Sequence, residues 1–317
     1  MSEPDRIRRW AIVTVLALLL GAIVQGFTAT TPWAVAGNQD RSSVMNSVID
    51  PMVLGAAAFA QDDYPAALRA FATAATEAAT PHGQAIAYGN RCRVWLAVED
   101  WPAAIEDCDR SIALQPQQSA AYLHRGLAWR GQKDLVRADQ DFSQALRFAP
   151  TDGRAWYNRG LTRAEQQQPV AAIADFDRAA VQFGHGTLGP LAQVYYDRAL
   201  TWLELRNFSQ ALADLDRVVR HNPANAEAFH ARGSVLQALG QSDRALASFD
   251  QAIALAPMNG PSYVARGRLH QQRHCSQAAI ADLECAARCF YECGDLAAYQ
   301  SVMLALRQLQ SSRTAIG

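Results

Sequence analysis

The sequence has almost no net charge of either sign. Its 317 residues include 29 Lys and Arg against 30 Asp and Glu, a formal net charge of −1. A protein that binds nucleic-acid phosphates needs a strongly basic surface. Because this chain has almost no net charge, nucleic-acid binding is not expected. Strand-forming residues do not dominate, whereas alanine is abundant and recurs in A-x-x-A patterns. This composition predicts close-packed helices rather than sheets.

The sequence also lacks the motifs of familiar catalytic sites. It contains no phosphate-cradling glycine loop, no nucleophile elbow and no His-Glu-x-x-His helix. Three cysteines near the C-terminus (Cys285, Cys289 and Cys293) lie at i, i+4 and i+8 of one expected helix. Three ligands on one straight face converge poorly on a metal ion, so small apolar packing is the expected role. The sequence therefore predicts no enzyme, no cofactor and no metal.

Residues 1–36 have the pattern of an export segment. Three arginines among the first nine residues precede an apolar run, residues 10–27, that no acid or base interrupts. Such a run is a signal peptide or a signal anchor. An A-x-A motif at residues 34–36 is a possible cleavage site, but it lies far from the apolar run. This distance favours an anchor, as does the length of the run, which is close to the ~17–25 residues that a bilayer requires. Both outcomes place the following chain on the non-cytoplasmic side, facing a periplasm or lumen. Residues 37–49 are expected to be a polar linker.

Beyond residue 48 the sequence repeats itself. A small residue recurs at spacings of 34, 34, 39, 34 and 34 residues, an alanine follows it after twelve residues, and an aromatic or apolar residue follows four further on. A period of this length indicates stacked helix pairs. The recurring small residues are Cys92, Gly126, Gly160, Ala199, Gly233 and Gly267. They allow two helices to approach closely, and Gly160 is expected at such a contact, whereas Gly131 is expected near a turn.

This pattern resembles the tetratricopeptide repeat, in which an aromatic stands early in the first helix of each unit. Here that position holds Tyr88, Tyr122, Trp156, Tyr195, Phe229 and Tyr263. The resemblance implies an all-α fold, an α-solenoid of about seven helix-turn-helix repeats wound as a right-handed superhelix. A C-terminal cap helix over residues 295–310 and an N-terminal hydrophobic helix complete the expected architecture. The expected repeats cover residues 48–81, 85–118, 119–152, 153–186, 192–225, 226–259 and 260–293.

Capping residues mark the expected helix starts. Asp50 before Pro51 predicts a helix that begins late in the first repeat. One further position, directly before the second helix of a repeat, holds a residue that can accept the free N–H groups of the first turn. It is occupied by Asp63, Asp100, Asp134 and Asn207.

One repeat position departs from the family. An arginine stands where the family usually has leucine, and an aspartate follows sixteen residues later. Because antiparallel helices bring these levels together, we expect a structural ladder of ion pairs, with a charged binding groove as the alternative. A second acid two residues beyond the first leaves the choice of partner open. The expected pairs are Arg91 with Asp107, Arg125 with Asp141, Arg159 with Asp175, Arg198 with Asp214 and Arg266 with Asp282.

Two cysteines replace core residues of a single repeat. Cys92 takes the place of the small residue and Cys108 that of the aromatic, so both are expected to point into one helix interface. A disulfide and a pair of buried free thiols remain alternatives, because the choice depends on the Cα separation and on the redox compartment.

The resemblance implies a non-catalytic scaffold that binds a protein or peptide in its concave groove. An assembly factor on the non-cytoplasmic side of a membrane is one example. Glutamine-rich turns such as residues 166–168 also resemble those of cyanobacterial members of the family. The alternatives are an accessory subunit of an envelope enzyme complex and, less favoured, helical-repeat RNA binding. The carboxylate-clamp subfamily needs a lysine where this chain has Gly89, so that function is not carried over. The groove-facing positions are Asn90, Arg93, His124, Arg154, Tyr157, Asn158, Tyr196, Asp197, His230 and Arg268.

Overall fold

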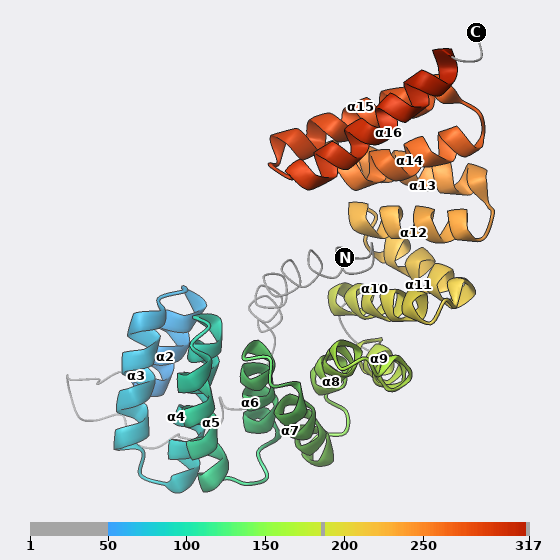
Figure 1. Cartoon of the computed structure of the whole chain (residues 1–317). Coiled ribbons are helices and arrows are strands. Elements are labelled where there is room, and N and C mark those ends of the chain that lie inside the picture. Colours follow the sequence, from blue (N-terminus) through green and yellow to red (C-terminus); the bar gives the residue numbers. More distant parts are fainter. Residues whose placement is uncertain (1–49, 185–187, 315–317) are drawn as a thin grey trace. The chain divides into compact units, whose positions relative to one another are not determined.

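The computed structural model describes residues 50–184 and 188–314, and this part of the chain is entirely helical (Figure 1). It contains fifteen α-helices and no strand, so the expectation of an all-α repeat protein is confirmed. The export segment and the linker expected over residues 1–49 lie outside the described residues. Within the described ranges, no helix combines the length and the hydropathy that a bilayer crossing requires.

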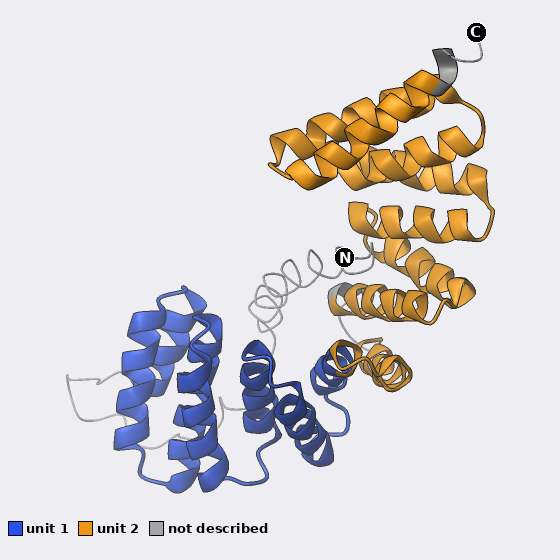
Figure 2. Cartoon of the chain, in the orientation of Figure 1, with its two compact units in different colours: residues 1–162 blue, residues 163–317 orange. Residues whose placement is uncertain are grey.

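The chain divides into two compact units, residues 1–162 and 163–317, with the boundary inside α8 (Gly153–Glu165) (Figure 2). The first unit contains α2 (Pro51–Ala60), α3 (Tyr64–Glu77), α4 (Pro81–Ala97), α5 (Trp101–Leu114), α6 (Ser119–Gly131) and α7 (Leu135–Phe148). The second unit contains α9 (Pro169–Phe183), α10 (Leu188–Glu204), α11 (Phe208–His221), α12 (Ala226–Ala238), α13 (Ser242–Leu255), α14 (Gly260–Gln272), α15 (Ser276–Glu292) and α16 (Leu296–Thr314).

Within each unit, consecutive helices pack in pairs, and the pairs pack on one another. In the first unit α2 packs on α3, α4 on α5 and α6 on α7, while α3 contacts α4 and α5 contacts α6. The second unit repeats this order, with α10 and α11, α12 and α13, and α14 and α15 as its pairs. A single pair buries little apolar surface, so each unit is stable as a stack of pairs.

The expected caps are present. Asp50 accepts a hydrogen bond from the Met52 N–H at 2.9 Å, and α2 begins at Pro51. The shared position before the second helix caps α3, α5, α7 and α11, for example with Asp100 accepting from the Ala103 N–H at 3.1 Å. The helix α4 begins at Pro81, ahead of the repeat start expected at 85, because Thr80 caps it.

Small residues in the first helix of a repeat make room for the ring of the second helix. A Cβ atom on Gly233 would lie 2.6 Å from the ring of Phe249, which is fully buried. Gly131 is the last residue of α6 and lies beside the turn, as expected. It also lies at a close contact between neighbouring repeats, because its added Cβ would lie 2.6 Å from the indole of Trp101 at the start of α5.

The helix α16 covers the last helix pair. Val302 and Leu306 are buried and share a hydrophobic cluster with Leu283 and Ala286 of α15. Leu296, the first residue of α16, is 59% exposed, and Ala298 is already buried. The stack in the second unit therefore ends in a solvating helix.

Candidate protein-binding site

The arginine at the unusual repeat position binds the aspartate sixteen residues later in its own repeat. Arg91 contacts Asp107 through Nε and Nη2, both at 2.6 Å. The aspartates are almost completely buried, with Asp107 at 2% exposure. The same two-pronged pairing joins Arg125 to Asp141, Arg198 to Asp214 and Arg266 to Asp282.

The second acid binds the arginine of the following repeat. Asp109 accepts from Arg125 at 2.5 Å, and Asp250 accepts from Arg266 at 2.6 Å. The same relation joins Asp177 to Arg198 and Asp216 to Arg232. Both acids therefore act at once, one within a repeat and one between repeats. The sequence analysis missed this role, although Asp109 and Asp250 stand sixteen residues before the next arginine and that spacing was a readable signal.

Two repeats vary the ladder. Arg232 pairs with Ser248 at 2.9 Å in place of an aspartate, while its other contact is Asp216 of the preceding repeat. Arg159 donates to Ser143 at 3.0 Å, in the first unit. The expected pair of Arg159 with Asp175 has one member in each compact unit, so that pairing stays a prediction.

Aromatic rings also pack against the ladder arginines. The Arg91 guanidinium lies 5.4 Å from the centroid of the Tyr88 ring, and the same contact recurs with the first aromatic of other repeats. Hydrogen bonding to Asp141 raises the pKa of Arg125. Because these arginines are held by carboxylates and rings, the ladder has little charge to offer a ligand and acts as a stacking device.

Cys92 and Cys108 form a disulfide between α4 and α5. Their Cα atoms are 5.6 Å apart, and both side chains are completely buried. They share a hydrophobic cluster with Ala104 and Ala128. In the next repeat the corresponding positions hold Gly126 and Phe142, so the disulfide fills the space that a ring fills elsewhere.

The ten expected groove positions divide into surface and core. Arg154 and Arg268 are exposed, and Asn90, Arg93, His124 and His230 are partly exposed. Four others are buried and offer little surface to a ligand, which corrects the expectation: Tyr157, Asn158, Tyr196 and Asp197. Their polar groups are engaged inside the fold. Asn158, for example, donates to the Arg154 carbonyl at 2.8 Å and accepts from Arg130 at 3.0 Å.

Three of the expected positions form a cationic cluster, which we call the Arg93–His124–Arg154 cluster. They come from α4, α6 and α8, the first helices of three successive repeats in the first unit. Burial and the charge of Arg154 lower the pKa of Arg93, and its guanidinium lies 4.9 Å from the centroid of the Phe59 ring. Burial, followed by the charges of Arg93 and Arg154, lowers the pKa of His124 to about 3. The charges of Arg93 and Arg154 are therefore close enough to influence each other and the imidazole of His124.

The cluster also contains an unsatisfied polar atom. The His124 side chain retains a little exposed surface, but its Nδ1 is buried and has no hydrogen-bond partner among the described residues. Asp152 lies beside the cluster, and Arg154 binds it at 2.8 and 3.0 Å. The two guanidinium groups of the cluster can hydrogen-bond to an anionic group and neutralise it.

The corresponding positions of the second unit have a different character. His230 Nδ1 lies 3.0 Å from the hydroxyl of Ser262, which is completely buried. Burial and the nearby charges of Glu227 and Asp197 raise the pKa of Tyr196. The geometry thus defines a helical-repeat protein whose first unit carries a basic site.

Comparison with known proteins identifies the family. The model of a tetratricopeptide repeat matches residues 93–153, 137–186 and 196–259. Residues 93–186 and 196–259 therefore belong to the tetratricopeptide-repeat family. No curated protein matches it in sequence.

Solved structures share the fold at low sequence identity. The pilF protein of Pseudomonas aeruginosa has a TM-score of 0.58 and 18% identity, over 70% of this chain and 97% of that one. A tetratricopeptide-repeat protein from Parabacteroides merdae has a TM-score of 0.54 and 15% identity, over 82% and 97%. YrrB, described as having an unusual peptide-binding site, has a TM-score of 0.50 and 21% identity, over 60% and 92%. These similarities establish the helical-repeat fold.

Proposed function

We propose that this chain is a non-catalytic scaffold that binds a protein or peptide partner through its first unit, on the non-cytoplasmic side of a membrane. The observation that carries the proposal is the Arg93–His124–Arg154 cluster, in which two guanidinium groups lie near a histidine whose buried ring nitrogen has no hydrogen-bond partner among the described residues. Perturbed ionisable groups gathered on one surface are typical of functional sites. The YrrB structure, whose description names a peptide-binding site, lends support by analogy.

The chemistry of the cluster selects an acidic partner. A carboxylate on the ligand relieves the repulsion between Arg93 and Arg154. The aromatic ring of Phe59 beneath Arg93 leaves that guanidinium pre-oriented. The proposed partner therefore presents one or more Asp or Glu side chains, or a C-terminal carboxylate.

A pair of peptides tests the proposal. The full chain in mild detergent is titrated with a glutamate-rich peptide and with its glutamine counterpart, and binding is followed by fluorescence anisotropy. We expect selective binding of the acidic peptide, which Arg93→Gln and Arg154→Gln each weaken roughly tenfold or more. Arg288→Gln, at an exposed position of α15, is the matched control and should bind as the unaltered chain does. Equal binding of both peptides would contradict the acidic-partner assignment.

The proposed location rests on two features. The sequence pattern of residues 1–27 is that of an export segment, and the Cys92–Cys108 disulfide suits an oxidising compartment. We expect alkaline phosphatase fused after Gly317 to be active. An inactive fusion together with an active cytoplasmic reporter would overturn this location.

An accessory subunit of an envelope enzyme complex is the second candidate. A pull-down from detergent-solubilised membranes separates the two. A scaffold should recover an acidic non-enzymatic partner, whereas an accessory subunit should recover an enzyme in fixed stoichiometry. Recovery of RNA without protein would contradict both.

A further inference from the structure

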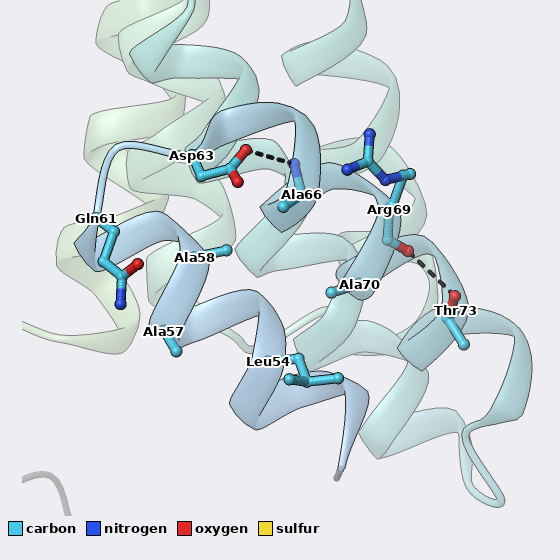
Figure 3. Close-up of a pocket in the computed structure, with 9 residues that line it drawn as sticks. All are labelled: Leu54, Ala57, Ala58, Gln61, Asp63, Ala66, Arg69, Ala70 and Thr73. Carbon is cyan, nitrogen blue, oxygen red and sulfur yellow. Dashed lines mark hydrogen bonds between the residues drawn. The ribbon is translucent and has the colours of Figure 1, made fainter. Parts of the chain in front are cut away.

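A groove of about 460 Å³ runs between the first two helices, α2 and α3 (Figure 3). Its lining residues recur at i, i+3, i+4 and i+7 on each helix, so the groove follows the helix pair along its length. Alanine side chains make up much of the lining and permit close approach. The lining consists of Leu54, Ala57, Ala58 and Gln61 on α2, Asp63 in the turn, and Ala66, Arg69, Ala70 and Thr73 on α3.

The groove contains the positions that carry the ion-pair ladder in later repeats. Leu54 stands where the second repeat has Arg91, and Ala70 stands where it has Asp107. The position of the second, repeat-linking acid is Ala72. The ladder therefore ends at the first repeat, and an apolar surface replaces it.

In other repeats the corresponding surface is covered by the preceding repeat. Val94, which matches Ala57 in repeat register, is completely buried and packs against Ala67 and Phe71 of the first repeat. Ala57 itself is exposed. The same position is buried in later repeats, at Ala128, Val235 and Leu269. The groove is thus a repeat-stacking surface that no preceding repeat covers among the described residues.

We propose that residues 42–49 of this chain dock into the α2–α3 groove and take the place of a preceding repeat. Val44, Met45, Val48 and Ile49 have the i, i+1, i+4, i+5 spacing of an apolar helix face, with serine and asparagine between them. The segment is joined directly to Asp50, the cap of α2, so it is present at high effective concentration beside the groove.

The dimensions of the segment suit the groove. The distance along α2 from Leu54 to Gln61 is about 10 Å at 1.5 Å per residue. Residues 44–49 span about 9 Å as a helix or about 20 Å when extended. Docking buries apolar side chains on both partners and gives the N-terminal end of the array a cover, as α16 does at the other end of the sequence.

Photocrosslinking on the full chain tests the occupant directly. Leu54→p-benzoylphenylalanine is irradiated in mild detergent, and the products are mapped by mass spectrometry. We expect intramolecular cross-links to residues 42–49. Val53→p-benzoylphenylalanine is the matched control, because Val53 is 42% exposed against 44% for Leu54 but does not line the groove. Cross-linked dimers, which would indicate a second copy, or cross-links to detergent alone would overturn the proposal.

Hydrogen exchange provides a second readout that does not depend on the probe. In a chain carrying Val44→Ser, Met45→Ser, Val48→Ser and Ile49→Ser, we expect the α2 amides to exchange roughly tenfold faster than in the unaltered chain. A tenfold change corresponds to the loss of one buried valine side chain. Val53→Ser is the control, and it should leave the exchange of the α3 amides beside the groove unchanged. Unchanged exchange of α2 in the fourfold variant would refute docking.

Discussion

Arg125 donates a hydrogen bond through Nη1 to Asp109, a residue of the preceding repeat, at 2.5 Å. The same guanidinium holds Asp141 of its own repeat through Nε and Nη2, at 2.8 and 2.7 Å. One side chain therefore fixes the two helices of its repeat and connects that repeat to its neighbour. This double use explains why the same arginine position recurs from repeat to repeat.

The two contacts of Arg125 should differ in strength. Arg125→Ala leaves Asp141 buried at 5% exposure without its partner, and we expect a loss of about 3–5 kcal/mol in the free energy of unfolding. Asp109→Ala removes a contact to a side chain that is 52% exposed, and we expect about 0–1 kcal/mol. Arg125→Leu should recover part of the loss, because the apolar stem still packs. Urea unfolding measures all three, and equal losses for the first two variants would argue against a buried ladder.

The disulfide should stabilise the second repeat. It closes a loop between residues sixteen apart in sequence, for which the expected contribution is about 3 kcal/mol. Cys92→Ala with Cys108→Ala should lower the melting temperature of the array. Cys92→Gly with Cys108→Phe should recover part of it, because this pair reproduces the packing of Gly126 and Phe142 in the next repeat. Calorimetry without reductant compares the variants, and similar melting of both double variants would show that the ring does not fit.

Two glycines should respond in opposite ways to substitution by alanine, because only one of them lies at a close helix contact. Gly233→Ala places a Cβ 2.6 Å from the buried Phe249 ring, so overpacking should cost about 1–3 kcal/mol. Gly83→Ala meets its neighbours at 3.5 Å, an ordinary contact, and should stabilise α4 by about 0.5–1 kcal/mol through lower backbone entropy. Thermal unfolding should shift in opposite directions for the two variants. A shift in the same direction would contradict the packing described here.

His124 should make the fold sensitive to mild acid. Its pKa is lowered from 6.5 to about 3, so between these values the unfolded chain binds a proton that the folded protein does not. Folding stability is therefore present above about pH 6.5 and is lost as the pH falls towards 3, by up to about 1.4 kcal/mol per pH unit.

Substitution isolates this effect. His124→Gln should flatten the pH dependence of urea unfolding between about pH 6.5 and 4, whereas His274→Gln, at an exposed position, should leave it unchanged. A parallel decline for His124→Gln and the unaltered chain would show that other groups cause the acid sensitivity.

The sequence by itself determined the repeat architecture. Periodic small residues, the capping position of Asp100 and the late start of α2 after Asp50 were readable, because each depends on local backbone chemistry and on helical spacing. The arginine and aspartate positions of the ladder were also readable from their regular spacing.

Only the tertiary structure decided which of these residues are available to a ligand. Asn158 and Arg154 both occupy expected groove positions, yet Asn158 is buried and bound to Arg130 while Arg154 is exposed. The exposure of a side chain depends on whether the neighbouring repeat covers it. The repeat spacing does not encode the side-chain volumes that meet at the contact between two repeats. For the same reason the sequence placed Gly131 correctly beside a turn but did not reveal that the indole of Trp101 from the preceding repeat packs against it.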